Sequence, residues 1–208
     1  SRKEGLIAFS NQEYYNGRLY TFPDVSANVI SSAQTPLIST DEKALSIPPD
    51  SFLQDYRNIG KLPAIEFYHV KKGVKEKGKN PIEAENIAEA ICNHFLRNQQ
   101  SDTSYSLGVV AFSEAQQEVI RTALEKKIRS NPTLESLIDF NAEEGLFIKN
   151  LENVQGDERD FIFFSVGYAR DPSGHMSLNF GPLNRAGGYR RLNVAITRAR
   201  IHIKLFAS

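Results

Sequence analysis

The chain has 208 residues, which fits one domain or one domain with an appendage, and its 40% apolar and 24% charged residues are typical of a globular protein with a sizeable core. The formal net charge is zero, so any nucleic-acid surface must be local. Cys92 is the one cysteine, which excludes an internal disulfide and a cysteine-based zinc site and fits a reducing cytoplasm. No apolar run approaches the ~20 residues of a membrane helix, so we expect a cytoplasmic protein without a membrane partner.

Residues 1–62 differ in composition from the rest of the chain. They are rich in proline, serine and threonine and show no long period. We predict a short helix over Leu6–Tyr15 and, for the rest, a loop that wraps the sheet. The chain therefore divides into an irregular segment, 1–62, and a main region, 63–208, within one structural domain. It begins with serine and ends directly after an apolar strand, so we expect a fragment of a larger protein.

From residue 64 onward, strands alternate with helices. The predicted strands are short and apolar: 64–70, 107–112, 146–148, 161–166 and 201–206. The predicted helices carry one apolar stripe each: 81–96, 114–130 and 192–200. Continuous apolar strands joined by helices are typical of right-handed crossovers between parallel strands. The sequence therefore predicts an α/β fold with a mostly parallel sheet flanked by helices.

Arginines mark the segment 190–200. If 192–200 is a helix, its apolar residues share one face, and Arg191 and Arg198, seven residues apart, stack on one edge of that face. A guanidinium stays charged and offers a planar fork of donors, which suits a phosphate. The spacing alone favours a phosphate-binding helix and a surface helix with solvated arginines about equally.

A polar turn, Gln155-Gly-Asp-Glu158, lies between two predicted strands. Glycine lets backbone N–H groups approach a ligand closely, and the polar side chains around it can accept hydrogen bonds from sugar hydroxyls. Taken alone, the pattern favours an ordinary turn with Gly156 at positive φ.

Together, the two segments resemble motifs V and VI of superfamily 1 helicases, most closely the branch that contains the nonsense-mediated decay helicase and its bacterial relatives. The stretches that carry this resemblance are 151–160 and Arg190-Arg-Leu-Asn-Val-Ala-Ile-Thr-Arg-Ala-Arg200. Three more stretches match in order: Gly5–Leu19 after motif IV, Asn80–Glu85 at the start of the second domain's first helix, and Gly108–Gln116 at a turn that touches the nucleic-acid backbone. The resemblance implies a RecA-like second motor domain, with the P-loop NTPase fold but no P-loop of its own.

The resemblance also implies roles at the nucleotide. Arg198 would be the arginine finger on the γ-phosphate, and Arg191 a second γ-phosphate or coupling arginine. Gly156 and Glu158 would lie beside the ribose and phosphates, with Glu158 accepting hydrogen bonds from ribose hydroxyls. Gln155 would link the nucleotide cleft to the bound strand.

The implied partners are single-stranded DNA or RNA and the first RecA-like domain of the same polypeptide. Ser113 and Gln116 would contact phosphates of the strand, which positions it without reading its sequence. ATP and Mg²⁺ would be held mostly by the first domain, because motifs I, Ia, II and III are absent here. The Tyr-Arg of motif IV would precede residue 1 and is also missing. We therefore expect part of an ATP-dependent DNA or RNA helicase, with no ATP hydrolysis by the isolated fragment.

Two stretches imitate the missing parts. Gly73-Val-Lys-Glu-Lys-Gly-Lys-Asn80 matches G-x-x-x-x-G-K between a strand and a helix. However, Asn80 replaces the hydroxyl residue that binds Mg²⁺, and Pro81 removes an N–H, so we favour a solvated basic loop. Asp41-Glu42 resembles a Mg²⁺-binding pair but follows Ser39-Thr40 rather than a buried strand, which favours a helix N-terminus.

Two other functions stay open. The chain could be a non-catalytic RecA-like module that binds nucleic acid or a partner, with the motor degenerate. On a weaker interpretation, the loop at Gly73 is a real phosphate loop in a small nucleotide-binding enzyme. No metal site is predicted, because the four histidines have no metal-ligand spacing: His69, His94, His175 and His202.

Overall fold

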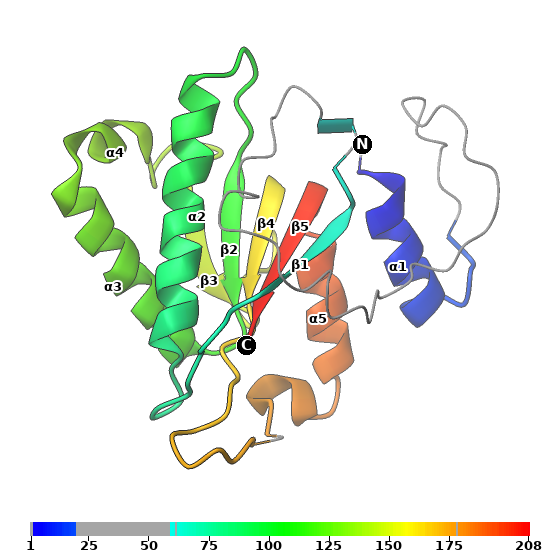
Figure 1. Ribbon diagram of the computed structural model, residues 1–208. Helices are drawn as coiled ribbons and strands as arrows, with labels where there is room; N and C mark the ends of the chain where they lie inside the picture. The colour runs from blue at the N-terminus through cyan, green and yellow to red at the C-terminus, as the bar shows by residue number, and fades with distance from the viewer. Residues whose placement is uncertain (1, 20–58, 61, 178) are drawn as a thin grey trace.

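Figure 1 shows a computed structural model of the protein, which describes residues 2–19, 59–60, 62–177 and 179–208. The described part contains a sheet of five strands in the order β1-β5-β4-β2-β3, and all four pairings are parallel. The strands are β1 (Ile65–His69), β2 (Leu107–Ala111), β3 (Phe147–Asn150), β4 (Arg159–Ser165) and β5 (Ala199–Ala207). The predicted parallel α/β sheet is confirmed.

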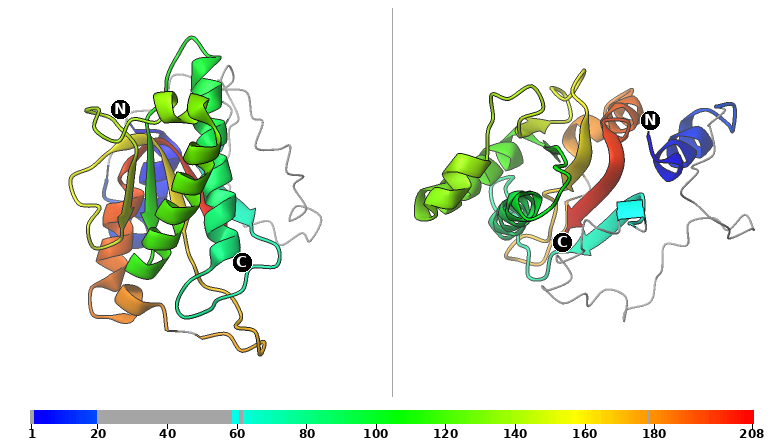
Figure 2. Two further views of the ribbon diagram at one scale, coloured as in Figure 1. Left: turned by 90° about the vertical axis from the view of Figure 1, so that its left-hand side faces the viewer. Right: turned by 90° about the horizontal axis from the view of Figure 1, so that it is seen from above.

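Helices cover both faces of this sheet (Figures 1 and 2). The helices are α1 (Glu4–Tyr14), α2 (Pro81–Gln99), α3 (Glu114–Ser130), α4 (Pro132–Leu137), the 3₁₀ turn η3 (Gly181–Asn184) and α5 (Gly188–Ile196). Side chains of successive strand residues point to opposite faces. Accordingly, Val109 packs in one core cluster with residues of α2 and α3, and Val110 packs in the other with residues of α1 and α5.

Local signals fix where α2 and α3 begin. The side chain of Asn80 accepts a hydrogen bond from the Glu83 N–H at 3.1 Å, and Pro81 occupies the first helical position. The Ser113 hydroxyl accepts from the Gln116 N–H at 3.2 Å in the same way. Both helices start directly after strand-and-loop segments at the carboxyl edge of the sheet. We use "carboxyl edge" for the side where the parallel strands end and "amino edge" for the side where they begin.

The predicted helix 192–200 is wrong at both ends. The helix α5 spans Gly188–Ile196, Arg198 lies in the following turn, and Arg200 is the second residue of β5. Backbone pairing ends the helix: the Arg159 N–H donates to the Arg198 carbonyl at 3.0 Å, and the Lys3 N–H donates to the Arg200 carbonyl at 2.8 Å. The apolar spacing could not show this, because Ala199 is buried in the strand as it would be in the predicted helix. Arg191 and Arg198 therefore do not stack on one helix edge.

Of the first 62 residues, the structure describes 2–19, 59–60 and 62. The predicted short helix is present as α1, which packs against α5 and β5. Most of the predicted wrapping loop, together with Asp41 and Glu42, lies outside the described residues. The division at residue 62 stays a prediction. Among the described helices, none combines the length and hydropathy that a membrane-spanning helix requires.

Candidate functional site

The two motif-like segments meet at the amino edge of the sheet. Glu158 directly precedes β4, and Arg198 directly precedes β5. Because β4 and β5 are parallel neighbours, the residues before them lie side by side. Nη1 of Arg198 lies 3.9 Å from Oε1 of Glu158. The structure thus brings together two of the residues that the sequence assigns to the nucleotide.

Arg2 completes this cluster. One terminal nitrogen of its guanidinium pairs with the same Oε1 of Glu158, and its Nε donates to the Thr197 carbonyl at 3.0 Å. The side chains of Arg2, Glu158 and Arg198 are 33%, 39% and 17% exposed, so a ligand can reach them. Two guanidiniums share one carboxylate, which leaves one positive charge for an anion. Sequence reasoning missed Arg2, because no spacing rule relates residues so far apart along the chain.

The side chain of Arg198 is held close to α5. Its Nε donates to the Val194 carbonyl at 2.9 Å, and its Nη2 donates to the Thr197 hydroxyl at 3.1 Å. Nη1 is directed towards Glu158. The guanidinium is therefore oriented before any ligand arrives. Arg191 is half-buried within α5, two helical turns before this position.

The turn at 155–158 is anchored at its sides and open at its tip. Val154 is fully buried, and the Asp157 carboxylate accepts a hydrogen bond from the Lys149 ammonium at 2.6 Å. Gln155 and Gly156 are exposed. Gly156 has φ +93°, and a β carbon there would meet no atom within 4 Å. The turn therefore presents unobstructed backbone, as close approach to a ligand requires.

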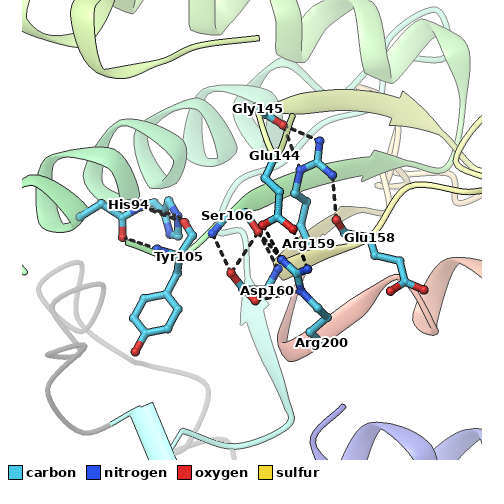
Figure 3. A network of polar contacts seen from close by, with 10 residues as sticks. His94, Tyr105, Ser106, Glu144, Gly145, Glu158, Arg159, Asp160 and Arg200 are labelled. Carbon is cyan, nitrogen blue, oxygen red and sulfur yellow. Dashed lines mark hydrogen bonds and ion pairs between the residues drawn. The ribbon is translucent and has the colours of Figure 1, made fainter. Parts of the chain in front are cut away.

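A second ionic network lies beside this cluster (Figure 3). Arg200 donates from Nε to Asp160 at 2.9 Å and from Nη2 to Glu144 at 2.6 Å, and Asp160 also accepts from the Ser106 hydroxyl at 3.0 Å. The hydrogen bond from Arg200 lowers the pKa of Glu144 to about 2. Sequence reasoning assigned no role to these residues, which tie the starts of the strands together and occupy the guanidinium of Arg200 with protein partners.

The two residues assigned to nucleic acid lie at the opposite, carboxyl edge. Ser113 is half-buried and caps α3. Gln116 is completely buried, and its amide donates to the Asn80 carbonyl at 3.2 Å and accepts from the Asn80 N–H at 2.8 Å. Gln116 therefore joins the start of α2 to α3, and its side chain is not in the exposed position that the predicted phosphate contact needs.

A buried carboxyl group lies next to this pair. Glu83 is 0% exposed and accepts hydrogen bonds from the Ser165 hydroxyl at 2.6 Å and the Gly167 N–H at 2.7 Å. Burial raises its pKa to about 7, although these hydrogen bonds act in the opposite direction. This group, also missed by sequence reasoning, fastens α2 to the carboxyl end of β4.

The loop at Gly73 does not have the form of a phosphate loop. Glu76 and Lys79 pair as a short antiparallel bridge, and Lys77 and Gly78 between them have φ of 48° and 81°. Two central residues at positive φ are typical of a tight hairpin turn. The Asn80 side chain is engaged in capping α2. These observations favour the basic-loop interpretation.

The described residues contain no group of three or more acidic, histidine or cysteine side chains placed to hold a metal ion.

Comparisons with known proteins give a matching family model and two relatives that are named as ATP-dependent helicases. Residues 2–208 match the family model described as "AAA domain". The "Uncharacterized ATP-dependent helicase MG140" of Mycoplasma genitalium and its homolog in Mycoplasma pneumoniae are each 40% identical over 143 residues, which is 67% of this chain. The matched segment spans only 12% of each relative. Among solved structures, the C-terminal domain of a possible DNA helicase from Lactobacillus plantarum WCFS1 aligns with a TM-score of 0.38 and 12% identity, covering 70% of this chain and 73% of that one.

Proposed function

Because the chain belongs to the AAA domain family, we propose that it is the second, C-terminal motor domain of a superfamily 1 ATP-dependent DNA or RNA helicase. The observation that carries this proposal is the 3.9 Å approach of Arg198 to Glu158 at the amino edge of the sheet. A partly exposed arginine whose direction is fixed by α5 is suited to a phosphate group delivered by a facing domain. The 40% identity to proteins named as ATP-dependent helicases supports the same assignment.

In this proposal, ATP binds between this domain and the first RecA-like domain of the same polypeptide. The γ-phosphate replaces Glu158 as the anion next to Arg198, and Glu158 accepts hydrogen bonds from the ribose hydroxyls. When the γ-phosphoryl group passes to water, negative charge spreads over its oxygens, and Arg198 stabilises that charge. Arg191 would assist from α5, while Gln155 and Gly156 would approach the nucleotide through the open turn.

Mg²⁺ does not fit the described residues of this chain, which offer no suitable cluster of ligands. We assign its binding to the first domain of the same polypeptide. Single-stranded nucleic acid would pass the carboxyl edge at Ser113. Gln116 would support this contact indirectly, by fixing the starts of α2 and α3.

The test is nucleic-acid-stimulated ATP hydrolysis by the full-length protein and its Arg198→Ala variant. An arginine finger contributes on the order of 10³ to 10⁵ in rate in well-studied NTPases, so we expect kcat to fall by that order while nucleotide binding is largely kept. Arg190→Ala is the matched control, because Arg190 is exposed on α5 and lies over the Tyr189 ring. Unchanged hydrolysis in Arg198→Ala would refute the assigned role, and a wild-type protein without any hydrolysis would favour a binding-only module.

A further inference from the structure

The loop between β1 and α2 concentrates positive charge. Residues 71–79 hold five of the chain's twelve lysines and one acid, Glu76, although the whole chain has no net charge. Lys71, Lys72, Lys77 and Lys79 are exposed, and Lys75 is half-buried. Like charges repel one another, so such a cluster favours an anionic partner.

Two of these lysines have a left-handed backbone conformation, which residues other than glycine rarely adopt. Lys72 has φ 63° and Lys77 has φ 48°. The left-handed region is unfavourable for an ordinary residue, and glycine or asparagine would be less strained there. The loop thus holds two cations at positions where their local conformation is unfavourable. Strain of this kind often accompanies a functional segment.

A second loop fixes the lysine loop in place. The Lys75 N–H donates to the Arg170 carbonyl at 3.0 Å, and the Lys75 ammonium lies 3.6 Å from the centre of the Tyr168 ring. Arg170 is itself exposed, and its backbone forms a bridge with Met176. Between the two loops is a hollow lined by residues that include His69, Lys72 and Arg170. Figure 1 shows both loops beyond the carboxyl ends of the strands.

This surface lies on the same edge as Ser113. The lysine loop ends at Asn80, and the buried amide of Gln116 holds the Asn80 backbone from α3. The Gln116 N–H in turn donates to the Ser113 hydroxyl. A short chain of contacts therefore connects Ser113, the proposed contact to nucleic acid, with the lysine loop. A nucleic-acid strand that passes Ser113 can continue to the lysine loop.

We propose that the lysine loop, 71–79, together with Arg170 forms a phosphate-binding site that extends the path of single-stranded nucleic acid. The site rests on the proposed function, because it assumes that a strand follows this edge. Ammonium groups attract phosphates as point charges, so the contact is independent of sequence and weakens as salt increases.

The test measures binding of a fluorescent 20-nucleotide oligo(dT) or oligo(U) to the full-length protein across a series of KCl concentrations. Each phosphate contact to a single strand contributes about 0.7 to the slope of log affinity against log salt. The Lys71→Gln/Lys77→Gln variant is expected to flatten this slope by about 1.4 and to weaken binding roughly tenfold near physiological salt. Lys126→Gln/Arg129→Gln is the matched control, since both residues are exposed at the far end of α3.

The outcomes separate this site from the proposed function. An unchanged slope in the loop variant, or an equal change in the control, would refute the site while leaving the helicase assignment intact. A wild-type protein that binds neither oligonucleotide would contradict the proposed strand partner itself. Circular dichroism of both variants checks that the fold is kept.

A different observation concerns Arg2, whose side chain connects both segments at the amino edge. It pairs with Glu158, and its Nε donates to the Thr197 carbonyl, directly before Arg198. The adjacent Lys3 N–H donates to the Arg200 carbonyl, so the backbone near Arg2 is fixed to β5. We infer that Arg2 is a positioning residue that aims the Glu158 carboxylate at the ribose hydroxyls. This role rests on the proposed nucleotide site.

The test compares ATP with 2′,3′-dideoxy-ATP as substrates of the full-length protein. Arg2→Ala is expected to raise KM for ATP several-fold with a smaller change in kcat, because the ribose contact is made already in the ground state. KM for the dideoxy nucleotide should not change, since that nucleotide has no hydroxyl for Glu158 to accept from. Arg2→Lys should restore KM in part, because lysine keeps the ion pair but cannot bond Glu158 and Thr197 with one fork.

A KM that rises equally for both nucleotides in Arg2→Ala would refute the positioning role and indicate a general loosening of the edge. The Glu158→Ala variant separates the positioning role of Arg2 from the proposed ribose contact of Glu158. If Glu158→Ala shows the ribose-dependent rise and Arg2→Ala does not, only the role of Arg2 fails. If Glu158→Ala raises KM equally for both nucleotides, the proposed ribose contact fails with it.

Discussion

The two edges of the sheet use polar residues in opposite ways. At the amino edge, Arg2, Glu158 and Arg198 are charged and partly exposed, and one carboxylate serves two guanidiniums. At the carboxyl edge, Glu83 and Gln116 are completely buried, with partners from neighbouring elements. The first arrangement can exchange a protein partner for a ligand without unpacking the core. The second fixes the starts of α2 and α3, so that exposed groups around them can make contacts.

The largest expected effect tests the amino edge through Arg198→Lys. Lysine keeps the charge but loses the planar fork that bonds Thr197 and faces Glu158 at once. An arginine finger contributes on the order of 10³ to 10⁵ to kcat. If the geometry of the guanidinium matters as much as its charge, Arg198→Lys will lose most of this contribution. Single-turnover ATP hydrolysis by the full-length protein measures this. A nearly active Arg198→Lys variant would mean that this edge supplies charge alone.

The next prediction tests the carboxyl edge through the pH dependence of stability. The pKa of Glu83 rises from 4.5 to about 7 on folding, so the folded state binds this proton more tightly than the unfolded state. The stabilisation from this bound proton is complete below pH 4.5 and is lost as the pH rises to about 7, a loss of roughly 3 kcal/mol. Glu83→Gln should therefore be more stable than the wild type at pH 8 and similar at pH 4.5. Urea unfolding at both pH values measures the difference, and identical pH profiles would contradict it.

His94 should give the opposite pH dependence. It is buried between α2 and β4, and burial lowers its pKa from 6.5 to about 4, although the hydrogen bond with the Tyr105 carbonyl at 2.7 Å favours the charged form. The folded state therefore binds this proton less tightly, and stability is lost as the pH falls from 6.5 towards 4. In a Glu83→Gln background, His94→Gln should remove most of this loss. A pH profile that is unchanged by the second substitution would locate the acid sensitivity elsewhere.

The smallest expected effect tests whether Gln116 stabilises the starts of α2 and α3 or contacts the nucleic acid directly. Gln116→Ala leaves the backbone N–H and carbonyl of Asn80 without these partners, which should cost about 1 to 3 kcal/mol of unfolding free energy. Glu118→Ala, at an exposed position on the same helix, is the control and should change little. Weaker binding of single-stranded nucleic acid by Gln116→Ala, without any loss of stability, would instead indicate direct contact with the nucleic acid. The two edges would then be more alike than the structure indicates.

The parts of the fold that follow local rules were predictable. The bounds of α3 agree with the prediction at both ends, because Ser113 is a strong capping residue and the apolar stripe continues to the last turn. The start of α2 was set by Asn80 and Pro81 in the same way. By contrast, the end of α5 depends on backbone pairing with Lys3 and Arg159, which no local pattern contains.

The candidate site was predictable only as far as its motifs extend. The motifs assigned Glu158 and Arg198 to one site, and parallel pairing of β4 and β5 explains why the two residues meet. Arg2 and Glu83 were missed because their partners lie far away in the sequence. Gln116 was assigned a phosphate contact in the turn after β2, but its burial depends on the packing of α2 against α3, which spacing does not report.

The position of β5 also has a consequence for synthesis on the ribosome. It is the last described strand in chain order, yet it lies between β1 and β4 in the sheet. The partner of β1 is therefore made about 130 residues after β1 itself, which at 5 to 20 residues per second is a delay of roughly 7 to 27 seconds. During that time the backbone groups of Ile65 and Phe67 lack their strand partner. The nascent chain thus carries an open apolar strand until β5 has been made.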